Sequence, residues 1–545
     1  MDPLKYALLI GLISFVFCED TEVVTIKNGK IRGRVVTTKY NTTFYSFQQI
    51  PFAEPPVGNL RFEPPVPKKD WDGILDCQNN TKICMQISRN SELETEDCLY
   101  INVYTPVKPG SSEKLPVLYY IYGGGFIFGN GIFNTNGPHY FMDNQIVLVT
   151  VGYRLGAFGF ISTEDKILPG NNGLRDQRLG LKWVQDNIET FGGDPQKVTI
   201  MGQSAGAASV TYQMMNDGSR GHFRAAIGQS GSMMCPWAAT INPSVIAFEL
   251  GNHLNFSGNT SHELKEFLRQ KSAVEIKKTS ETLTETYTDD IFLPVVEVDH
   301  EDAFISKPMY TALLNGEVNH VPLLIGIVSE ERISKLSDGI EAFINELKTY
   351  DNDLSLLVPY NMRINDTDLK QEIGKQIREI YTNETLEEYV QAGVKYFSDR
   401  DFNKAVMRFA EVESNFTDVY FYKFSYSGPL GHNDIVKLPG IEKVIHSEDN
   451  YYIWVPNGND TDIYQYPDTD RVISELYVKM FADFTKNSNL ETFVNGVTWP
   501  KFANGTFPYL NIDEKLEIKH HPFGASYEKW ISLYDEYAKK PMYTF

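Results

Sequence analysis

Basic residues are scarce in this 545-residue chain, which carries 50 Lys and Arg against 71 Asp and Glu. The resulting formal net charge of −21 at pH 7 repels the phosphates of nucleic acids and of anionic membrane surfaces. We therefore expect no nucleic-acid partner and no binding to such surfaces.

Cysteine is also scarce. The five cysteines include no Cys-x-x-Cys pair and no nearby partner histidine, which argues against a zinc site. Three of them, Cys77, Cys84 and Cys98, lie close together in the sequence. In an oxidising compartment two such neighbours can form a disulfide, and spacing alone does not choose the pair.

Long apolar runs are missing. Residues 1–18 place one Lys before an apolar stretch that is too short to span a bilayer and ends at Cys18. This pattern predicts a secretory signal peptide, with a buried N-terminal helix or a membrane anchor as the alternative. The C-terminal residues show no retention signal and no apolar tail for a lipid anchor. We expect a secreted, extracellular, soluble chain with no membrane span.

Sequons for N-glycosylation, spread along the chain in polar contexts, agree with this route. The candidate asparagines are Asn41, Asn79, Asn255, Asn259, Asn365, Asn383, Asn415, Asn459 and Asn504.

Repeats, low-complexity tracts and Ser/Gly-rich linkers are absent, so we expect one domain over residues 19–545. Three nearly continuous apolar runs, at 115–126, 145–162 and 197–203, are typical of buried strands. Such strands, alternating with helices, predict an α/β fold with a mostly parallel sheet covered on both faces.

Helical periodicity appears in two places. Leu181, Val184, Ile188 and Phe191 recur at helical spacing and predict a helix that paired glycines close. The charged region from about residue 342 to 409 is also helix-periodic. We expect it to form a helical layer over the carboxyl edge of the sheet, where α/β proteins bind ligands.

The stretch "VTIMGQSAGAASV" at 198–210 contains a Gly-x-Ser-x-Gly motif between a strand and small helix formers. At such a turn Gly202 and Gly206 avoid clashes, and Ser204 projects into an open site as a nucleophile. A structural turn is the alternative, because isolated matches occur by chance.

Backbone donors for an oxyanion are expected upstream. Three glycines at 123–125 directly follow an apolar strand and expose successive N–H groups. A Gly-rich hairpin turn is the alternative. We assign an oxyanion hole to the N–H groups of Gly124, Gly125 and Ala205, at the start of the helix after the serine.

The remaining members of such a site follow in the order acid, then base. Four late histidines are candidates for the base, and spacing does not choose among them. They are His432, His446, His520 and His521.

Longer motifs carry a resemblance to a known family. Among them are "YSFQQIPFAEPPVGNLRFEPP", "TEDCLYINVYTP", "YGGGF", "GYRLGAFGF", "FRAAIGQSGS", "PGIEKVIH" and the run from 170 to 210. Over nearly the whole mature chain, the sequence resembles the type-B carboxylesterases, which include insect carboxylesterases, juvenile hormone esterases and cholinesterases. The resemblance implies an α/β-hydrolase fold, with a helical layer over the active-site gorge.

The resemblance also implies roles for individual residues. Ser204 becomes the nucleophile, His446 the base and Glu331 the acid. Arg332 departs from the family, which has glycine after the acid, and this leaves Glu330 as an alternative. A second departure is Tyr122, where many esterases have histidine before the three glycines, although cholinesterases also carry tyrosine there.

The family pairs Cys84 with Cys98, which leaves Cys77 and Cys235 unpaired and buried. By spacing alone, a bridge from Cys77 to Cys84 or to Cys98 remains open.

Met233, Met234 and Trp237 lie where the family places acyl-pocket residues, and core packing is the equal alternative.

Two features argue against a cholinesterase. The segment between Cys84 and Cys98 contains no tryptophan to stack on a quaternary ammonium, and Gln203 stands where cholinesterases have glutamate.

Taken together, the motifs and the resemblance predict a serine carboxylesterase that acts on small-molecule esters through an acyl-enzyme, without a metal or organic cofactor. A juvenile hormone, odorant or pheromone esterase is the narrower alternative. A non-catalytic adhesion or binding protein, similar to neuroligins, is the alternative from another class.

Overall fold

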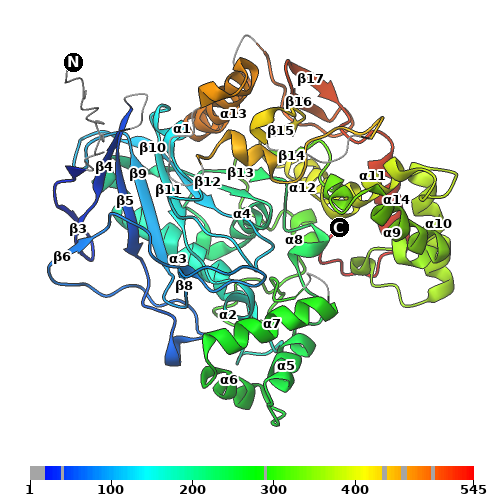
Figure 1. Cartoon of the computed structure of the whole chain (residues 1–545), viewed down its shortest axis with the longest axis horizontal. Coiled ribbons are helices and arrows are strands. Elements are labelled where there is room, and N and C mark those ends of the chain that lie inside the picture. The colour runs from blue at the N-terminus through cyan, green and yellow to red at the C-terminus, as the bar shows by residue number, and fades with distance from the viewer. Residues whose placement is uncertain (1–18, 38–41, 288–290, 432–437, 456–462, 493–496) are drawn as a thin grey trace, which may run out of the picture.

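The computed structural model describes residues 19–37, 42–287, 291–431, 438–455, 463–492 and 497–545. The expected signal peptide at 1–18 lies outside the described residues, as do Asn41, His432 and Asn459. Within the described residues, twelve strands form one large sheet with helices around it (Figure 1). In order across the sheet they are β1 (Glu19–Asp20), β4 (Arg34–Thr37), β5 (Thr43–Pro51), β9 (Tyr100–Thr105), β11 (Val147–Val151), β10 (Leu115–Ile121), β12 (Gly193–Gln203), β13 (Ala225–Gln229), β14 (Leu323–Val328), β15 (Val419–Phe424), β16 (Pro508–Ile512) and β17 (Leu516–His520).

The middle of this sheet is parallel. Every neighbouring pair from β11 to β16 is parallel, whereas the pairs at the two edges are antiparallel. β11, β13 and β14 are buried along their whole length, as expected for strands covered on both faces. The predicted α/β class is confirmed.

Two small sheets accompany the large one. β2 (Val24–Ile26), β3 (Gly29–Arg32) and β6 (Ile74–Asp76) form one, and β7 (Ile83–Cys84) pairs with β8 (Glu94–Thr95) in the other.

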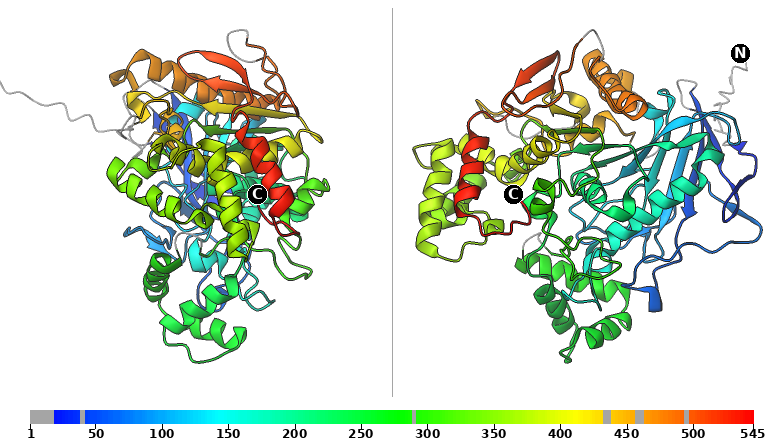
Figure 2. Two further views of the ribbon diagram at one scale, coloured as in Figure 1. Left: turned by 90° about the vertical axis from the view of Figure 1, so that its right-hand side faces the viewer. Right: turned by 180° about the vertical axis from the view of Figure 1, so that it is seen from behind.

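The helices have the following bounds: α1 (His139–Met142), α2 (Gly156–Phe160), α3 (Asn172–Asn187), α4 (Ala205–Met215), α5 (Pro243–His253), α6 (Ser261–Arg269), α7 (Ala273–Tyr287), α8 (Met309–Leu314), α9 (Ile340–Asn352), α10 (Thr367–Tyr381), α11 (Val390–Ser398), α12 (Lys404–Glu413), α13 (Asp468–Asn487) and α14 (Ser526–Tyr537). Helices α5 to α7 gather at one side of the molecule, and α9 to α11 gather with α14 at another (Figure 1, Figure 2).

The helix-periodic region near 342–409 forms α9 to α12. Helix α12 packs on β14 and β15, while α9 and α11 contact the short 3₁₀ helix η5 (Ile333–Leu336), which follows the carboxyl end of β14. Between α11 and α12 the chain makes a π-helical turn, η8 (Asp399–Asn403). This region therefore packs against a segment that leaves the carboxyl edge of the sheet.

The prediction of one strand over 145–162 is wrong in its second half. Strand β11 ends at Val151, and Gly156–Phe160 form the short helix α2. Gly152 lies so close to the neighbouring chain that a Cβ there would be 2.7 Å from the Cys98 carbonyl oxygen, and Gly156 has a positive φ of 53°. Two glycines thus turn the chain out of the sheet, although the apolar pattern continues.

The predicted helix after this segment is confirmed. It forms α3, followed by the 3₁₀ helix η2 (Ile188–Phe191), and the four periodic apolar residues are fully buried. Gly192, in the left-handed region at φ 79°, ends it as expected.

Cys84 and Cys98 form a disulfide, and Cys77 and Cys235 are free and buried. Burial raises the pKa of both free thiols to about 12, so they remain protonated and unreactive.

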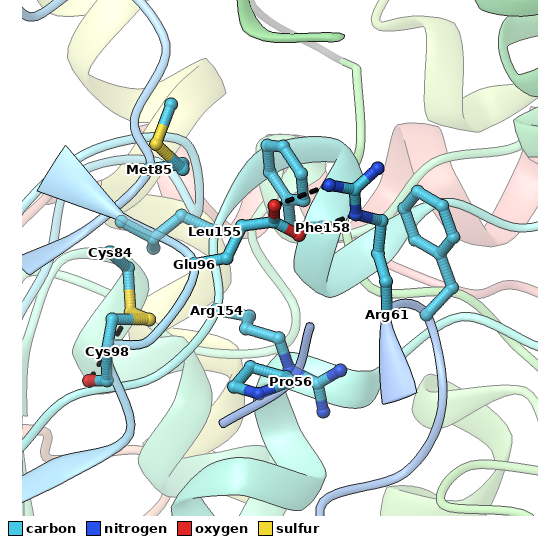
Figure 3. Close-up of a pocket in the computed structure, with 10 residues that line it drawn as sticks. Pro56, Arg61, Cys84, Met85, Glu96, Cys98, Arg154, Leu155 and Phe158 are labelled. Carbon is cyan, nitrogen blue, oxygen red and sulfur yellow. Dashed lines mark hydrogen bonds and ion pairs between the residues drawn. A yellow bond between two sulfur atoms is a disulfide. The ribbon is translucent and has the colours of Figure 1, made fainter. Parts of the chain in front are cut away.

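Figure 3 shows the disulfide beside a small pocket in which Arg61 pairs with Glu96. Arg61 also donates to the Leu268 carbonyl at the end of α6 and so joins this region to the α5–α7 group.

A fully buried ion pair fixes the segment after β11 onto α3. The Arg154 guanidinium donates to both Asp176 carboxylate oxygens at 2.8 and 2.7 Å, and the Arg154 main-chain N–H donates to the same carboxylate at 3.0 Å. A further bond reaches the Glu63 carbonyl at 2.7 Å. Because every charged atom has a partner, the pair tolerates burial.

Breaking this pair should destabilise the fold. Asp176→Asn is expected to lower the free energy of unfolding by about 3–5 kcal/mol, because it leaves the Arg154 charge buried without its counter-charge. Urea unfolding followed by circular dichroism measures the loss. Lys182→Gln is the control, since it breaks an exposed ion pair with Asp186 on the same helix and should cost less than about 1 kcal/mol. Equal losses in the two variants would contradict the assignment.

Candidate active site

Ser204 occupies a sharp turn between β12 and α4. Its φ of 57° and ψ of −122° are strained for a residue with a side chain. The Ser204 main-chain N–H donates to the Gln229 carbonyl of β13 at 2.8 Å, which fixes the turn to the neighbouring strand. The serine side chain is therefore held at the carboxyl end of the parallel strands.

The two glycines of the motif are required by close packing. A Cβ on Gly202 would lie 2.2 Å from the Gly206 carbonyl oxygen, and a Cβ on Gly206 would lie 2.0 Å from the Ile121 carbonyl oxygen. Both distances are far below any tolerated contact. The Gly-x-Ser-x-Gly pattern thus follows from the geometry of this turn.

Ser204, His446 and Glu331 form a continuous series of short contacts. His446 Nε2 lies 2.9 Å from Ser204 Oγ, and His446 Nδ1 lies 2.6 Å from Glu331 Oε2. Glu331 follows β14 and is fully buried, and its other carboxylate oxygen accepts the Val328 N–H at 3.1 Å. A hydroxyl, an imidazole and a carboxylate in this order are the parts of an activated serine nucleophile.

Glu330 lies apart from this series. Its side chain lines a separate cavity of about 490 Å³ together with Lys395 and Lys423, and burial raises its pKa to about 7. Between the two adjacent acids, the structure places only Glu331 against the imidazole of His446.

Two of the other late histidines make unrelated contacts. His520 Nδ1 lies 2.9 Å from the Thr506 carbonyl oxygen, and the His521 ring packs edge-on against Phe507. Of the three described candidates, only His446 contacts Ser204.

The glycine run passes directly against the serine turn. A Cβ on Gly123 would lie 3.0 Å from the Ser204 Cβ. Gly124 and Gly125 both have positive φ, and among the described residues their N–H groups donate to no acceptor. Ala205 is the first residue of α4, so its N–H has no carbonyl one turn earlier to bind. These three donors are available for an oxyanion.

Tyr122, which departs from the commoner histidine, packs in the core. Its ring stacks on Tyr153 with a centroid distance of 4.4 Å, and its hydroxyl donates to the Tyr153 carbonyl at 3.1 Å. The side chain thus supports the strand end that leads into the glycine run.

The predicted acyl-pocket residues divide into two groups. Met233 and Met234 are fully buried. Trp237 is only partly buried, and its ring centroid lies 5.3 Å from that of Phe402. The Phe402 ring in turn lies 4.4 Å from the His446 ring. Of the three, Trp237 is thus joined to the imidazole, through Phe402.

The sequence did not predict that two residues, Phe402 and Gln203, would lie beside His446, although Gln203 had been singled out as a difference from cholinesterases. One is Phe402, which sits in the π-helical turn η8, where no helical period marks it. The other is Gln203, whose side-chain amide nitrogen donates to Ser447 Oγ at 2.8 Å and lies 3.3 Å from His446 Nε2. The position of Gln203 next to the serine was the only available signal.

Neither a metal cluster nor a membrane-spanning helix was found in the part of the chain that the structure describes. No three His, Cys, Asp or Glu side chains there come together as metal ligands. No helix in the same ranges is both long and apolar enough to cross a bilayer.

The chain is similar to known proteins over most of its length. The carboxylesterase family model matches residues 20–530. Esterase FE4 of Myzus persicae is 34% identical over 522 residues, which cover 91% of this chain and 91% of that protein. Juvenile hormone esterase of Tribolium castaneum is 30% identical and covers 90% of this chain and 89% of its own length.

A solved structure confirms the fold. The crystal structure of juvenile hormone esterase from Manduca sexta, with OTFP covalently attached, superposes with a TM-score of 0.84 at 26% identity, over 95% of this chain and 100% of that one. Together with the family match and the identity to esterase FE4, this shows that the chain belongs to the carboxylesterase family.

Proposed function

We propose that the chain hydrolyses carboxylic esters through an acyl-enzyme formed on Ser204. The observation that carries the proposal is the continuous series of contacts from Ser204 through His446 to the buried Glu331. Serine is a weak nucleophile until a neighbouring base removes its proton, and this arrangement supplies that base.

Acylation uses all three of these groups. His446 Nε2 accepts the Ser204 hydroxyl proton while Oγ attacks the ester carbonyl carbon. The carbonyl oxygen becomes an oxyanion, which the N–H groups of Gly124, Gly125 and Ala205 bind. His446 then gives its proton to the departing alkoxide, and the acyl group remains on Ser204. Glu331 orients the imidazole and stabilises its charged form.

Deacylation repeats these steps with water as the nucleophile. His446 accepts a proton from water, the hydroxide attacks the acyl carbon, and the same three N–H groups bind the second oxyanion. Return of the proton to Ser204 Oγ releases the carboxylic acid. The enzyme then returns to its starting state, and the chain's own residues perform every step.

The proposed substrates are small-molecule esters. Two of the relatives bear the name juvenile hormone esterase, so juvenile hormone esters belong in the first screen, beside odorant and pheromone esters. The complete Ser204–His446–Glu331 series disfavours a non-catalytic adhesion or binding role, because a purely binding protein has no need of an activated nucleophile.

Export to an extracellular compartment is part of the proposal. The Cys84–Cys98 disulfide requires an oxidising environment. The sequon asparagines that the structure describes are all exposed, as glycan attachment demands; they are Asn79, Asn255, Asn259, Asn365, Asn383, Asn415 and Asn504.

Replacing the nucleophile should abolish turnover. Ser204→Ala is expected to lower kcat for a short aryl ester by about 10⁴-fold or more, because no other hydroxyl can form the acyl-enzyme. Hydrolysis by wild type and variant, with matching thermal unfolding to show that both are folded, measures this. A fluorophosphonate probe should label only the wild type. Retained hydrolysis by a folded Ser204→Ala protein would refute the mechanism.

The two adjacent acids should behave differently. Glu331→Gln is expected to lower kcat by about 10³–10⁴-fold, because the imidazole loses the carboxylate that orients it. Glu330→Gln is the matched control, and it should leave kcat within about threefold. The reverse result would assign the acid to Glu330.

The Glu330→Gln variant also tests the ionisation of Glu330 in the wild type. In the folded state the pKa of Glu330 is raised to about 7. As the pH rises from the carboxyl pKa of the unfolded chain toward 7, the unfolded chain loses this proton more readily than the folded chain, so the free energy of unfolding falls. Glu330→Gln should therefore be more stable than wild type at pH 8, by up to about 3 kcal/mol, and no more stable at pH 4.

Export can be tested directly. Insect cells that express residues 1–545 should release the protein into the medium with N-glycans, which peptide-N-glycosidase removes with a drop in mass. A form that lacks residues 1–18 should remain in the cell without glycans. Intracellular, unglycosylated protein from the full sequence would contradict the proposed route.

A further inference from the structure

We propose that Arg332 is a positioning residue, which holds an aromatic wall formed by Phe402 and Trp237 against His446 and so limits the ester groups that fit beside the imidazole. This inference rests on the proposed esterase function and adds a specificity determinant to it. Arg332 directly follows the carboxylate that contacts His446, so the same loop carries both the acid and the proposed support of the wall.

Arg332 makes three contacts with the end of α11 and the turn that follows it. Its main-chain N–H donates to Ser398 Oγ at 3.0 Å, and its side-chain Nε donates to Asp401 Oδ2 at 2.7 Å. Its guanidinium carbon lies 5.1 Å from the centroid of the Phe402 ring, within the range of a cation–π contact. One side chain thus binds two consecutive residues of η8.

Phe402 carries this support to the catalytic imidazole. Its ring is 3% exposed and lies 4.4 Å from the His446 ring on one side and 5.3 Å from the Trp237 ring on another. The Trp237 indole N–H donates to the main-chain oxygen of Asp401 at 2.8 Å. Trp237 is therefore bound to η8 through Asp401 and packs on Phe402, the next residue of the same turn.

The carboxylate of Asp401 is kept ionised between Arg332 and Arg400. Burial alone would raise its pKa, but the charges of Arg332 and Arg400 and their hydrogen bonds outweigh burial and lower the pKa to about 2. Arg400 donates from Nε to the other carboxylate oxygen at 2.6 Å, and its guanidinium lies over Phe397 rather than Phe402. The two arginines share Asp401, but only Arg332 covers the aromatic wall.

The backbone of η8 is unusual. A π-helical turn is rare, occurs mostly as a single turn within an α-helix, and is frequent at functional sites. The ion pair and the cation–π contact from Arg332 hold this turn on one face. A glycine at this position would supply neither, and Phe402 would be free to turn away from His446.

The direct test compares Arg332→Met with Phe402→Leu. Methionine retains an apolar stem but loses the ion pair and the cation–π contact. Both variants should change the ratio of kcat/KM between small and bulky esters by about tenfold or more in favour of the bulky ester. Two series locate the effect: nitrophenyl esters of increasing acyl size, and acetates of increasing alcohol size. We expect a change in one series and less than threefold change in the other.

The double variant separates positioning from general destabilisation. If Arg332 acts through Phe402, then Arg332→Met in the Phe402→Leu background should produce less than threefold further change in the ratio. Arg332→Lys, which restores a charge for Asp401, should recover part of the wild-type ratio. Arg400→Met is the matched control: it also removes a partner of Asp401 and should lower the unfolding temperature, but with a smaller change in the ratio.

The outcomes distinguish this inference from the function on which it rests. A wild type without esterase activity overturns both. An active wild type whose Arg332→Met variant is folded and keeps the ratio within threefold in both series overturns only the role of Arg332. So does full additivity of Arg332→Met and Phe402→Leu. If Arg332→Met fails to fold, Arg332→Lys and Phe402→Leu are compared in the same way.

Discussion

The strained main-chain turn at Ser204 is the constraint on which the rest of the site depends. A residue with a side chain holds φ and ψ of 57° and −122° only where its surroundings leave no alternative. Glycines surround it for that reason: Gly202 and Gly206 lie within its own motif, and a Cβ on Gly231 would lie 2.4 Å from the Ser204 carbonyl oxygen. Parallel pairing aligns Gly202 of β12 with Ile121 at the end of β10, so the glycine run and the serine emerge side by side.

Burial changes the pKa values of acids near this turn. Glu331 is fully buried beside an imidazole that becomes positive during the proposed reaction. Asp449, three residues after His446, is also buried, and burial with the nearby charge of Glu331 raises its pKa. It accepts hydrogen bonds from Gln229 at 2.9 Å and Tyr477 at 2.7 Å. Burial thus raises the pKa values of Glu330 and Asp449, whereas Glu331 is the acid that contacts the imidazole of His446.

The sequence predicted those parts of the site that depend on backbone geometry. Gly202, Ser204 and Gly206 form a readable pattern because the turn excludes side chains, and the periodic apolar residues of α3 are readable because one face is buried. The resemblance to a known family then separated His446 from the other late histidines, which spacing could not do.

Other parts could not be predicted, because they depend on contacts between distant segments. Glu330 and Glu331 are adjacent and chemically alike, and only the direction of each side chain distinguishes them. Phe402 reaches His446 because a π-helical turn alters the helical register, for which the apolar pattern has no signature. The end of β11 was missed because the hydrophobic run continues beyond the strand into α2.

The two free thiols have a consequence for how the chain matures. Once folded, Cys77 and Cys235 are buried with raised pKa values, so neither supplies the thiolate that attacks a disulfide. In the unfolded chain Cys77 lies only seven residues from Cys84, close enough to pair with it in place of Cys98. Folding removes that alternative, because the completed core protects the Cys84–Cys98 bond from attack by the chain's own thiols.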